Sequence, residues 1–497
     1  MGESAPTRYR FGPLERRGLV AGWRGGQIGA VAGALVVGVG VLRMSPSAVG
    51  VVVALAALAI GVGVATWPIA GRTAEQWAPE ALRHALTRLR GSPAGARPFS
   101  GVHLIRVDVA ATAGGSTERG ATGAGSDVGV GVLHDRTRRT FTAVLGASDP
   151  GFVLLGEEDK ARRVSAWSEV LASLARDGSA VHRVQWIERV LPAAEMASAV
   201  SVSVPAATND AGYDTATASY QALVEAEAGA SLRHEVLLGV TVHAGRAGRA
   251  VKSAGGGSTG ACSVLLREVA ALRRRLADAS IEAGAVLTPH ALAAVVRGAY
   301  EGRTAPRPDA APSGARRSPR PSPPEEPSPW PMGVAGEWSR LRVDGTWHAT
   351  YWVAEWPRTD AGPDFLGPLL LSSDIRRTMS VVMEPLGPIE AARKVEQART
   401  ADIADAEIRR RGGFLATARR RREEEILERR EVELADGHGQ YRFSGYVTVS
   451  APDPDALEDG CGRVEQAAGR AGLELRRCYG DQANTFMCTL PLGRGLA

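Results

Sequence analysis

The sequence predicts an α/β (α+β) protein with an N-terminal two-helix transmembrane hairpin and two cytoplasmic α/β units, joined by a Pro-rich linker and a long charged helix. Two uncharged apolar stretches lie close together near the N-terminus, which predicts the hairpin. Strand-like and helix-like segments alternate through most of the remaining chain, which is typical of sheets covered by helices. The 497 residues are too many for one core and predict more than one domain.

The apolar stretches cover residues 25–42 and 48–69. The second is about long enough to cross a hydrocarbon core of ~30 Å as a helix. Only residues 43–47 separate the two stretches, and such a short turn places both ends of the pair on one side of the membrane. We therefore expect a hairpin of two spans at residues 25–69.

Arginines flank the hairpin on both sides, whereas its turn holds a single Arg43. Because positive charge favours the cytoplasmic side, we expect a plasma (inner) membrane protein with a cytoplasmic tail at residues 1–24 and both termini in the cytoplasm. Tryptophans at the two ends suit the headgroup zone, and small residues four apart allow close helix packing. The residues expected to anchor or pack the hairpin are Trp23, Arg24, Gly29, Gly33, Ala57, Gly61, Trp67 and Arg72.

The first cytoplasmic unit is expected at residues 101–302, after a juxtamembrane amphipathic helix within residues 70–100. Alternating apolar residues predict its strands, and apolar residues three or four apart predict its helices. The expected strands lie at residues 102–109, 128–133, 140–145, 180–190, 235–243 and 283–287, and the main helices at 157–176, 261–279 and 290–300. A proline-rich linker, which cannot bury a core, follows at residues 303–335.

The second unit is expected at residues 336–494, with a long charged helix at residues 388–432. Arginine clusters in this helix stand beside glutamates with which they can pair, so a solvated helix face is the plain interpretation. Docking of a partner is the alternative role for Arg409, Arg410, Arg411, Arg419, Arg420, Arg421 and Arg422. Near the end of the unit, Asp453 is expected to cap a helix that has Pro454 at its first position.

The residue patterns needed for catalysis or cofactor binding are absent from the sequence. A P-loop needs a lysine after a glycine, and the three lysines fail this test; Val251-Lys252-Ser253 comes nearest but lacks the glycine. No histidine pair has metal-ligand spacing, and no nucleophile elbow is present. The four cysteines show no paired spacing, which fits reduced thiols in a cytoplasmic domain. We therefore expect no enzyme activity, no catalytic residue, no cofactor and no metal.

Near the C-terminus, an expected strand–helix–strand segment leads into Phe486-Met487-Cys488-Thr489-Leu490-Pro491-Leu492-Gly493. Together with the order of hairpin, α/β domain and long charged helix, this end resembles an actinobacterial family of conjugation and type IV secretion membrane proteins. In that resemblance the hairpin is similar to the two-span PrgI-type subunit, and the remaining chain to the non-motor N-terminal part of the large conjugation ATPase. The resemblance implies an oligomeric, non-enzymatic membrane scaffold that docks a separate P-loop ATPase and other inner-membrane channel subunits.

Two other functions fit the same sequence. A membrane subunit of a type VII secretion channel would also combine a hairpin with a cytoplasmic α/β domain. A membrane-tethered nucleic-acid-binding protein would use the arginine clusters within residues 409–422 to neutralise phosphates, although the neighbouring glutamates argue against a purely basic face.

Overall fold

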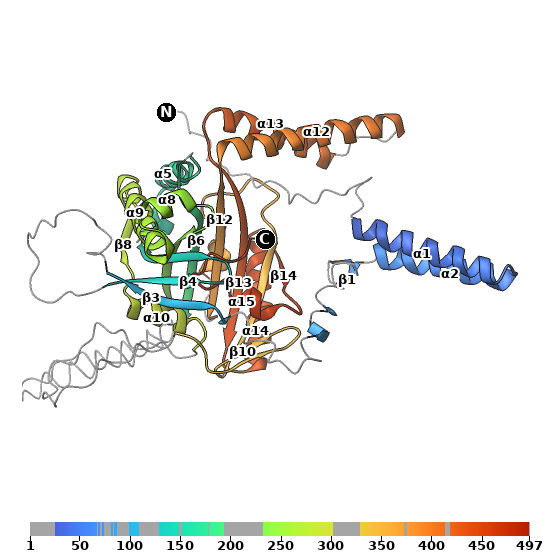
Figure 1. Cartoon of the computed structure of the whole chain (residues 1–497), viewed down its shortest axis with the longest axis horizontal. Helices are drawn as coiled ribbons and strands as arrows, with labels where there is room; N and C mark the ends of the chain where they lie inside the picture. The colour runs from blue at the N-terminus through green and yellow to red at the C-terminus, as the bar shows by residue number, and fades with distance from the viewer. Residues whose placement is uncertain are drawn as a thin grey trace, which may run out of the picture.

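The computed structural model describes residues 25–66, 68–69, 72–73, 81–82, 84–86, 99–108, 129–148, 152–176, 178–192, 232–301, 329–371, 375–412 and 418–496. Two apolar helices, α1 (Gly25–Met44) and α2 (Ala48–Thr66), pack against each other as a hairpin that stands apart from the rest of the molecule (Figure 1). A short antiparallel pair of β1 (Pro68–Ile69) and β2 (Arg72–Thr73) follows the hairpin. The rest of the described chain forms a body built on a large sheet.

Twelve strands of the described residues form one sheet, and every pairing within it is antiparallel. Its main order is β3-β4-β5-β7-β6-β12-β13-β11-β10-β9, while β8 pairs with β5 and β14 pairs with β11. The strands are β3 (Val102–Val107), β4 (Val130–Asp135), β5 (Thr140–Ser148), β6 (Val181–Pro192), β7 (Leu232–His243), β8 (Glu282–Val286), β9 (Val334–Gly336), β10 (Leu341–Val343), β11 (Thr346–Glu355), β12 (Arg377–Leu386), β13 (Gln440–Ala451) and β14 (Glu474–Arg477).

Helices connect the strands and cover the sheet. Asp453 caps the helix after β13 by accepting hydrogen bonds from two backbone N–H groups, which confirms the predicted cap. Thr288 caps the helix after β8 with its hydroxyl. The helices of the body are α5 (Glu157–Leu174), α8 (Gly248–Ser253), α9 (Gly257–Asp278), α10 (Pro289–Gly298), α11 (Gly367–Leu370), α12 (Pro388–Gly412), α13 (Ala418–Ala435), α14 (Pro454–Arg470) and α15 (Gln482–Phe486), with a 3-10 turn η2 (Phe152–Leu154) before α5.

The body consists of two halves with the same topology. The first half runs through β3 to β8, then α10, and the second runs through β9 to β14, then α15. Read from either outer edge of the sheet, the strands follow the same sequence: β3-β4-β5-β7-β6 in the first half and β9-β10-β11-β13-β12 in the second. The equivalent strands β6 and β12 pair antiparallel at the centre, so an approximate two-fold axis passes through that pair. The structure therefore carries an internal structural repeat.

Both faces of the sheet bury apolar side chains. On one face, α5 and α9 cover the first half and α14 covers the second, and Trp186 at the centre contacts both cores. On the other face, α10 and α15 help to form one core that spans both halves and includes Ile187 of β6, Leu341 of β10 and Phe486 of α15. The second face thus holds the two halves together.

The C-terminal segment, residues 487–496, crosses the second face over the centre of the sheet. Gln185 on β6 is fully buried beneath it. The Gln185 amide donates to the backbone oxygens of Cys488 and Leu490, both at 2.9 Å, and accepts from the backbone N–H of Gly493 at 2.8 Å. One side chain in the middle of the sheet therefore fixes the path of this segment.

Side chains beyond Gln185 attach the same segment to the first half. Arg494 donates to the Oδ2 of Asp135 at 3.0 and 2.7 Å, and both side chains are buried. Arg183 donates to the backbone oxygens of Gly493 and Leu496, each at 3.0 Å. The end of the second half is consequently part of the core of the first half.

The predicted fold class is wrong in two respects. The described strands form one antiparallel sheet shared by both sides of the Pro-rich stretch, rather than separate α/β units. The reason is that alternation of strands and helices along a chain does not fix which strands pair, and strands such as β6 and β12 meet only through tertiary packing. The predicted transmembrane hairpin is also wrong: within the described ranges, no helix has both the length and the apolar character that crossing a membrane requires.

Candidate partner-docking surfaces

The helical hairpin exposes an unusual amount of apolar surface. Its two helices meet through small residues, and a methyl group placed on Gly38 would lie 3.5 Å from the backbone oxygen of Ala54. Many other apolar side chains of the hairpin are exposed: Val36 is 70% exposed, Val49 71% and Leu55 61%. Contiguous exposed apolar surface of this kind marks an interaction site for lipid or protein.

The sequence-predicted hairpin residues occupy different positions in this arrangement. Methyl groups at Gly29 and Gly33 would meet no neighbouring atom within 4 Å, so the described packing of α1 on α2 does not use them. Ala57 and Gly61 are half-buried on α2. Trp23, Arg24 and Trp67 lie outside the described residues, and Arg72 is described only as part of the backbone of β2.

Helices α12 and α13 form a second hairpin, which projects from the sheet between β12 and β13 (Figure 1). Arg399 of α12 donates two hydrogen bonds to the carboxylate of Glu431 on α13, at 2.8 and 2.6 Å. Arg411 pairs with Glu407 on its own helix at 2.9 Å. Of the predicted docking arginines only the side chain of Arg411 is described; those of Arg409, Arg410, Arg419, Arg420, Arg421 and Arg422 lie outside the described part.

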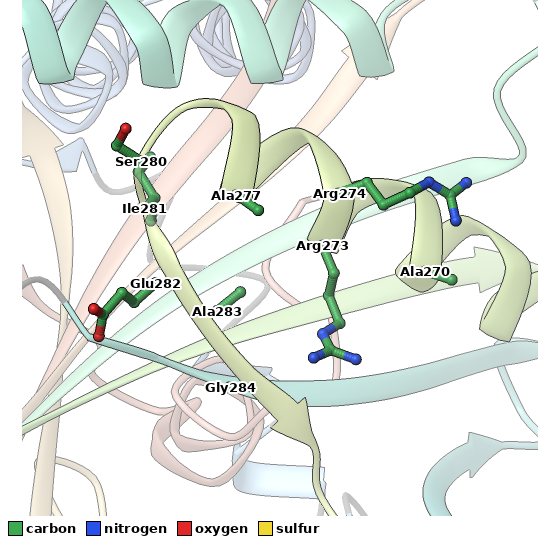
Figure 2. Close-up of a pocket in the computed structure, with 9 residues that line it drawn as sticks. All are labelled: Ala270, Arg273, Arg274, Ala277, Ser280, Ile281, Glu282, Ala283 and Gly284. Carbon is green, nitrogen blue, oxygen red and sulfur yellow. The ribbon is translucent and has the colours of Figure 1, made fainter. Parts of the chain in front are cut away.

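A third surface is the outer edge of strand β8, which pairs with no other strand among the described residues and is called its free edge below. This strand pairs with β5 on one side, and a groove of about 940 Å³ lies along α9 and β8. Figure 2 shows the two elements joined by the turn at Ser280, with Arg273 extending from the helix toward the strand side and Arg274 extending away. Unpaired backbone groups at a sheet edge can receive an extended segment of another protein.

A buried ion cluster lies at the end of the central strands. The carboxylate of Glu384 on β12 accepts hydrogen bonds from Arg246 at 2.8 Å, Arg442 at 2.9 Å and Arg183 at 3.1 Å. Burial by itself would raise the pKa of Glu384, but the hydrogen bond from Arg442 and the charge of Arg183 lower it to about 2. Burial and Arg183 lower the pKa of the neighbouring His182 to about 4.

The sequence carries no local signal for this cluster. Glu384 lies far along the chain from Arg183 and Arg246, and only the pairing of β6 with β12 and the turn after β7 bring the three together. A signal for the structural repeat is present but faint: Thr140 begins β5 opposite Asp135, and Thr346 begins β11 opposite Val343, so a threonine follows the first hairpin turn of each half.

Comparison with known proteins points to the class of membrane-associated secretion components. One family profile matches the chain, over residues 230–353. The family is described as a "type VII ESX secretion system translocon, EccE". The match covers the segment from the start of β7 to β11, which includes α8, α9 and the free edge of β8. No curated protein matches the chain.

This finding overturns the resemblance to conjugation and type IV secretion proteins, because the family that matches is a type VII one. The mistaken resemblance was based on the order of elements and on the segment Phe486 to Gly493, and that segment lies outside residues 230–353. In the structure that segment is a buried part of the body, held by Gln185. Its apolar composition therefore reflects packing within this chain.

Proposed function

We propose that this chain is a non-enzymatic scaffold subunit of a membrane-bound type VII secretion translocon. The observation that carries the proposal is the match of residues 230–353 to a translocon family. The exposed apolar hairpin supports it independently, because a purely soluble protein rarely presents so many adjacent exposed valines and leucines.

In this proposal the hairpin associates with the membrane through its exposed apolar side chains. The arginines that flank the hairpin favour the cytoplasmic face of the plasma membrane, because its anionic lipids attract them, and in this proposal the body lies on that side. The body then offers its docking surfaces to other channel subunits and to a separate P-loop ATPase. The α12–α13 hairpin and the free edge of β8 are the surfaces that the fold leaves accessible for them.

Purification of the tagged full-length chain from its native cells tests the proposal. Membranes are extracted with a mild detergent, and the proteins that co-purify are identified by mass spectrometry. We expect the chain in the membrane fraction together with other type VII channel subunits, including a P-loop ATPase. A variant that lacks residues 25–66 serves as the control, and it is expected to leave the membrane fraction.

Recovery with conjugation or type IV subunits instead would contradict the assignment. Full recovery in the soluble fraction without detergent would contradict the role of the hairpin. Strong binding of the purified chain to DNA, with a steep dependence on salt, would favour a nucleic-acid-binding function in its place.

A further inference from the structure

A second groove lies at the opposite end of α9 from the free edge of β8. Its volume is about 1020 Å³, and it is lined by the β4–β5 turn, by α8 and by the glycine-rich turn that leads into α9. Phe141 and Val251 contribute apolar surface, whereas Arg139, Arg246, Arg249 and Lys252 contribute positive charge. None of the described residues that line this groove is acidic.

Three of these cations are free to bind a ligand. Arg139, Arg249 and Lys252 are exposed, and their side chains make no hydrogen bond or ion pair with any other part of the chain that the structure describes. Arg246 differs, because it donates to Glu384 at 2.8 Å. The groove therefore concentrates positive charge that no side chain among the described residues neutralises at Arg139, Arg249 or Lys252.

The local turn is fixed so that these side chains surround the groove. His243, at the end of β7, accepts hydrogen bonds from the backbone N–H groups of Gly245 and Arg246, at 3.0 and 3.1 Å. Burial and then the positive charge of Arg246 lower the pKa of His243, so its ring is neutral and suited to accept these bonds. The turn is thus set by a side chain of the sheet.

The first half contains a segment beside the groove that has no equivalent in the second half. In the second half, only residues 452–453 separate β13 from α14. In the first half, residues 244–256 separate β7 from α9 and supply α8, Arg246, Arg249 and Lys252. The glycines at 255 and 256 have φ values of +103° and +72°, and nothing fills the space beside them. Val251 of this insertion packs into the core of the first half, whereas the exposed Arg249 and Lys252 beside it make no contribution to that core.

We propose that this groove binds a small anion that carries phosphate groups. Arginine and lysine are the side chains that most often bind phosphate, and several cations in one concave site attract anions more strongly than isolated ones do. Two or more phosphates match a set of cations that is spread over the β4–β5 turn and α8. The anion site itself does not depend on the assignment to a translocon, whereas the choice of a soluble ligand rests on the membrane contact of the hairpin in the proposed function.

The position of the groove indicates whether its phosphate ligand is a soluble compound or a lipid headgroup. In Figure 1, α8 and α9 lie on the side of the body opposite to the α1–α2 hairpin. If the hairpin contacts the membrane as proposed above, the groove faces away from the lipid surface. A soluble phosphate compound is therefore the expected ligand, and a lipid headgroup is the alternative that the experiment separates.

Calorimetric titration of the purified full-length chain in detergent tests the site, with pyrophosphate, ATP and sulfate as separate probes. The test variant is Arg249→Gln with Lys252→Gln. The matched control is Arg273→Gln with Arg274→Gln, which removes the same charge from the groove along β8. A parallel arm measures binding of the hairpin-deleted chain to vesicles with and without phosphatidylglycerol.

We expect pyrophosphate and ATP to bind the wild type and the control alike, and the test variant at least tenfold more weakly. All four substituted side chains are exposed, so equal melting temperatures without ligand are expected and check the fold. The site would be overturned if both variants bound pyrophosphate and ATP equally weakly, or if sulfate bound as tightly as these two compounds. It would also be overturned if the wild type bound neither pyrophosphate nor ATP. Binding to phosphatidylglycerol vesicles without binding to pyrophosphate or ATP would overturn the soluble ligand.

Discussion

Glu384 joins separate parts of the body through one carboxylate. Its hydrogen bonds come from β6, from the turn after β7 and from β13, while the residue itself lies on β12. Bringing these charges out of water is costly, and such a cluster adds little net stability over apolar packing. Removal of the carboxylate alone is expected to destabilise the fold strongly, because it leaves a buried arginine without its partner.

The first prediction concerns loss of this carboxylate. Glu384→Ala is expected to lower the free energy of unfolding by about 3–5 kcal/mol, since Arg183 stays buried and loses its counter-charge. The control is Glu390→Ala on α12, where the exposed carboxylate of Glu390 pairs with Lys394. This control should change the free energy of unfolding by less than about 1 kcal/mol. Urea unfolding of the full chain measures both, and similar losses in the two variants would count against the buried cluster.

The second prediction concerns acid. The pKa of Glu384 falls from its ordinary 4.5 to about 2 in the folded chain, so its charge stabilises the fold fully above pH 4.5. This contribution is lost as the pH falls from 4.5 toward 2. The stability difference between the wild type and Glu384→Gln should therefore shrink over that range, which melting temperatures at stepped pH would follow. A constant difference would contradict the assignment.

At the scale of elements, the C-terminal segment and the α12–α13 hairpin have opposite characters. The C-terminal segment has little regular structure, yet it is buried and bonded to β6 and β4. The α12–α13 hairpin is regular, yet it projects from the sheet and its described ion pairs are exposed. Regular structure and contribution to the core are thus separate properties in this chain.

The third prediction compares two glycines with left-handed backbones. Gly493 has φ +62°, and a methyl group there would lie 2.3 Å from the Oγ1 of Thr241. Gly437, after α13, has φ +88° and open space around it. Gly437→Ala is expected to cost about 1–2 kcal/mol for the backbone alone. Gly493→Ala should cost clearly more in the same unfolding measurement, because the clash adds to that cost; equal losses would show that the segment is loosely packed.

The fourth prediction concerns the α12–α13 hairpin. Replacement of residues 388–437 by an Asn-Gly turn should preserve the sheet, because β12 and β13 already pair from Arg377 to Leu386 and Asn-Gly favours hairpins. The melting temperature should change little, whereas co-purification of the partner that docks there should be lost. If the variant without this hairpin still co-purified with every partner in wild-type amounts, the hairpin would not be a docking surface.

At the scale of the whole molecule, the two halves share a sheet, a core and the C-terminal segment. The central pair of β6 with β12 extends from Arg377 to Met383, and the core of the second face draws residues from both halves. The two halves are therefore expected to unfold together, although the Pro-rich stretch separates them in the chain.

The fifth prediction tests this coupling. A specific protease site placed within residues 303–328 is cleaved in the folded chain, and the products are analysed by size exclusion without denaturant. The two pieces should elute together, because the β6–β12 pairing and the contact of Arg494 with Asp135 hold them. Separation of the pieces would show that the halves are independent domains.

Most individual elements of the body could be predicted from the sequence. Alternation along β7 and the Asp453 cap of α14 are local signals, and the structure has both elements close to the expected ranges. The single antiparallel sheet and the repeat could not be predicted, since both depend on the pairing of β6 with β12 across nearly two hundred residues. The positions of Arg249 and Lys252 in one groove likewise follow from the turn that His243 fixes.

The sequence by itself determined most of the strand and helix segments, and it predicted two apolar helices close together within residues 25–69, because periodicity and caps act over a few residues. Tertiary structure alone decided that the two halves form one sheet, that residues 487–496 are buried across it, and that Glu384 meets its arginines. These outcomes depend on contacts between residues far apart in the chain, and no local sequence pattern predicts such contacts.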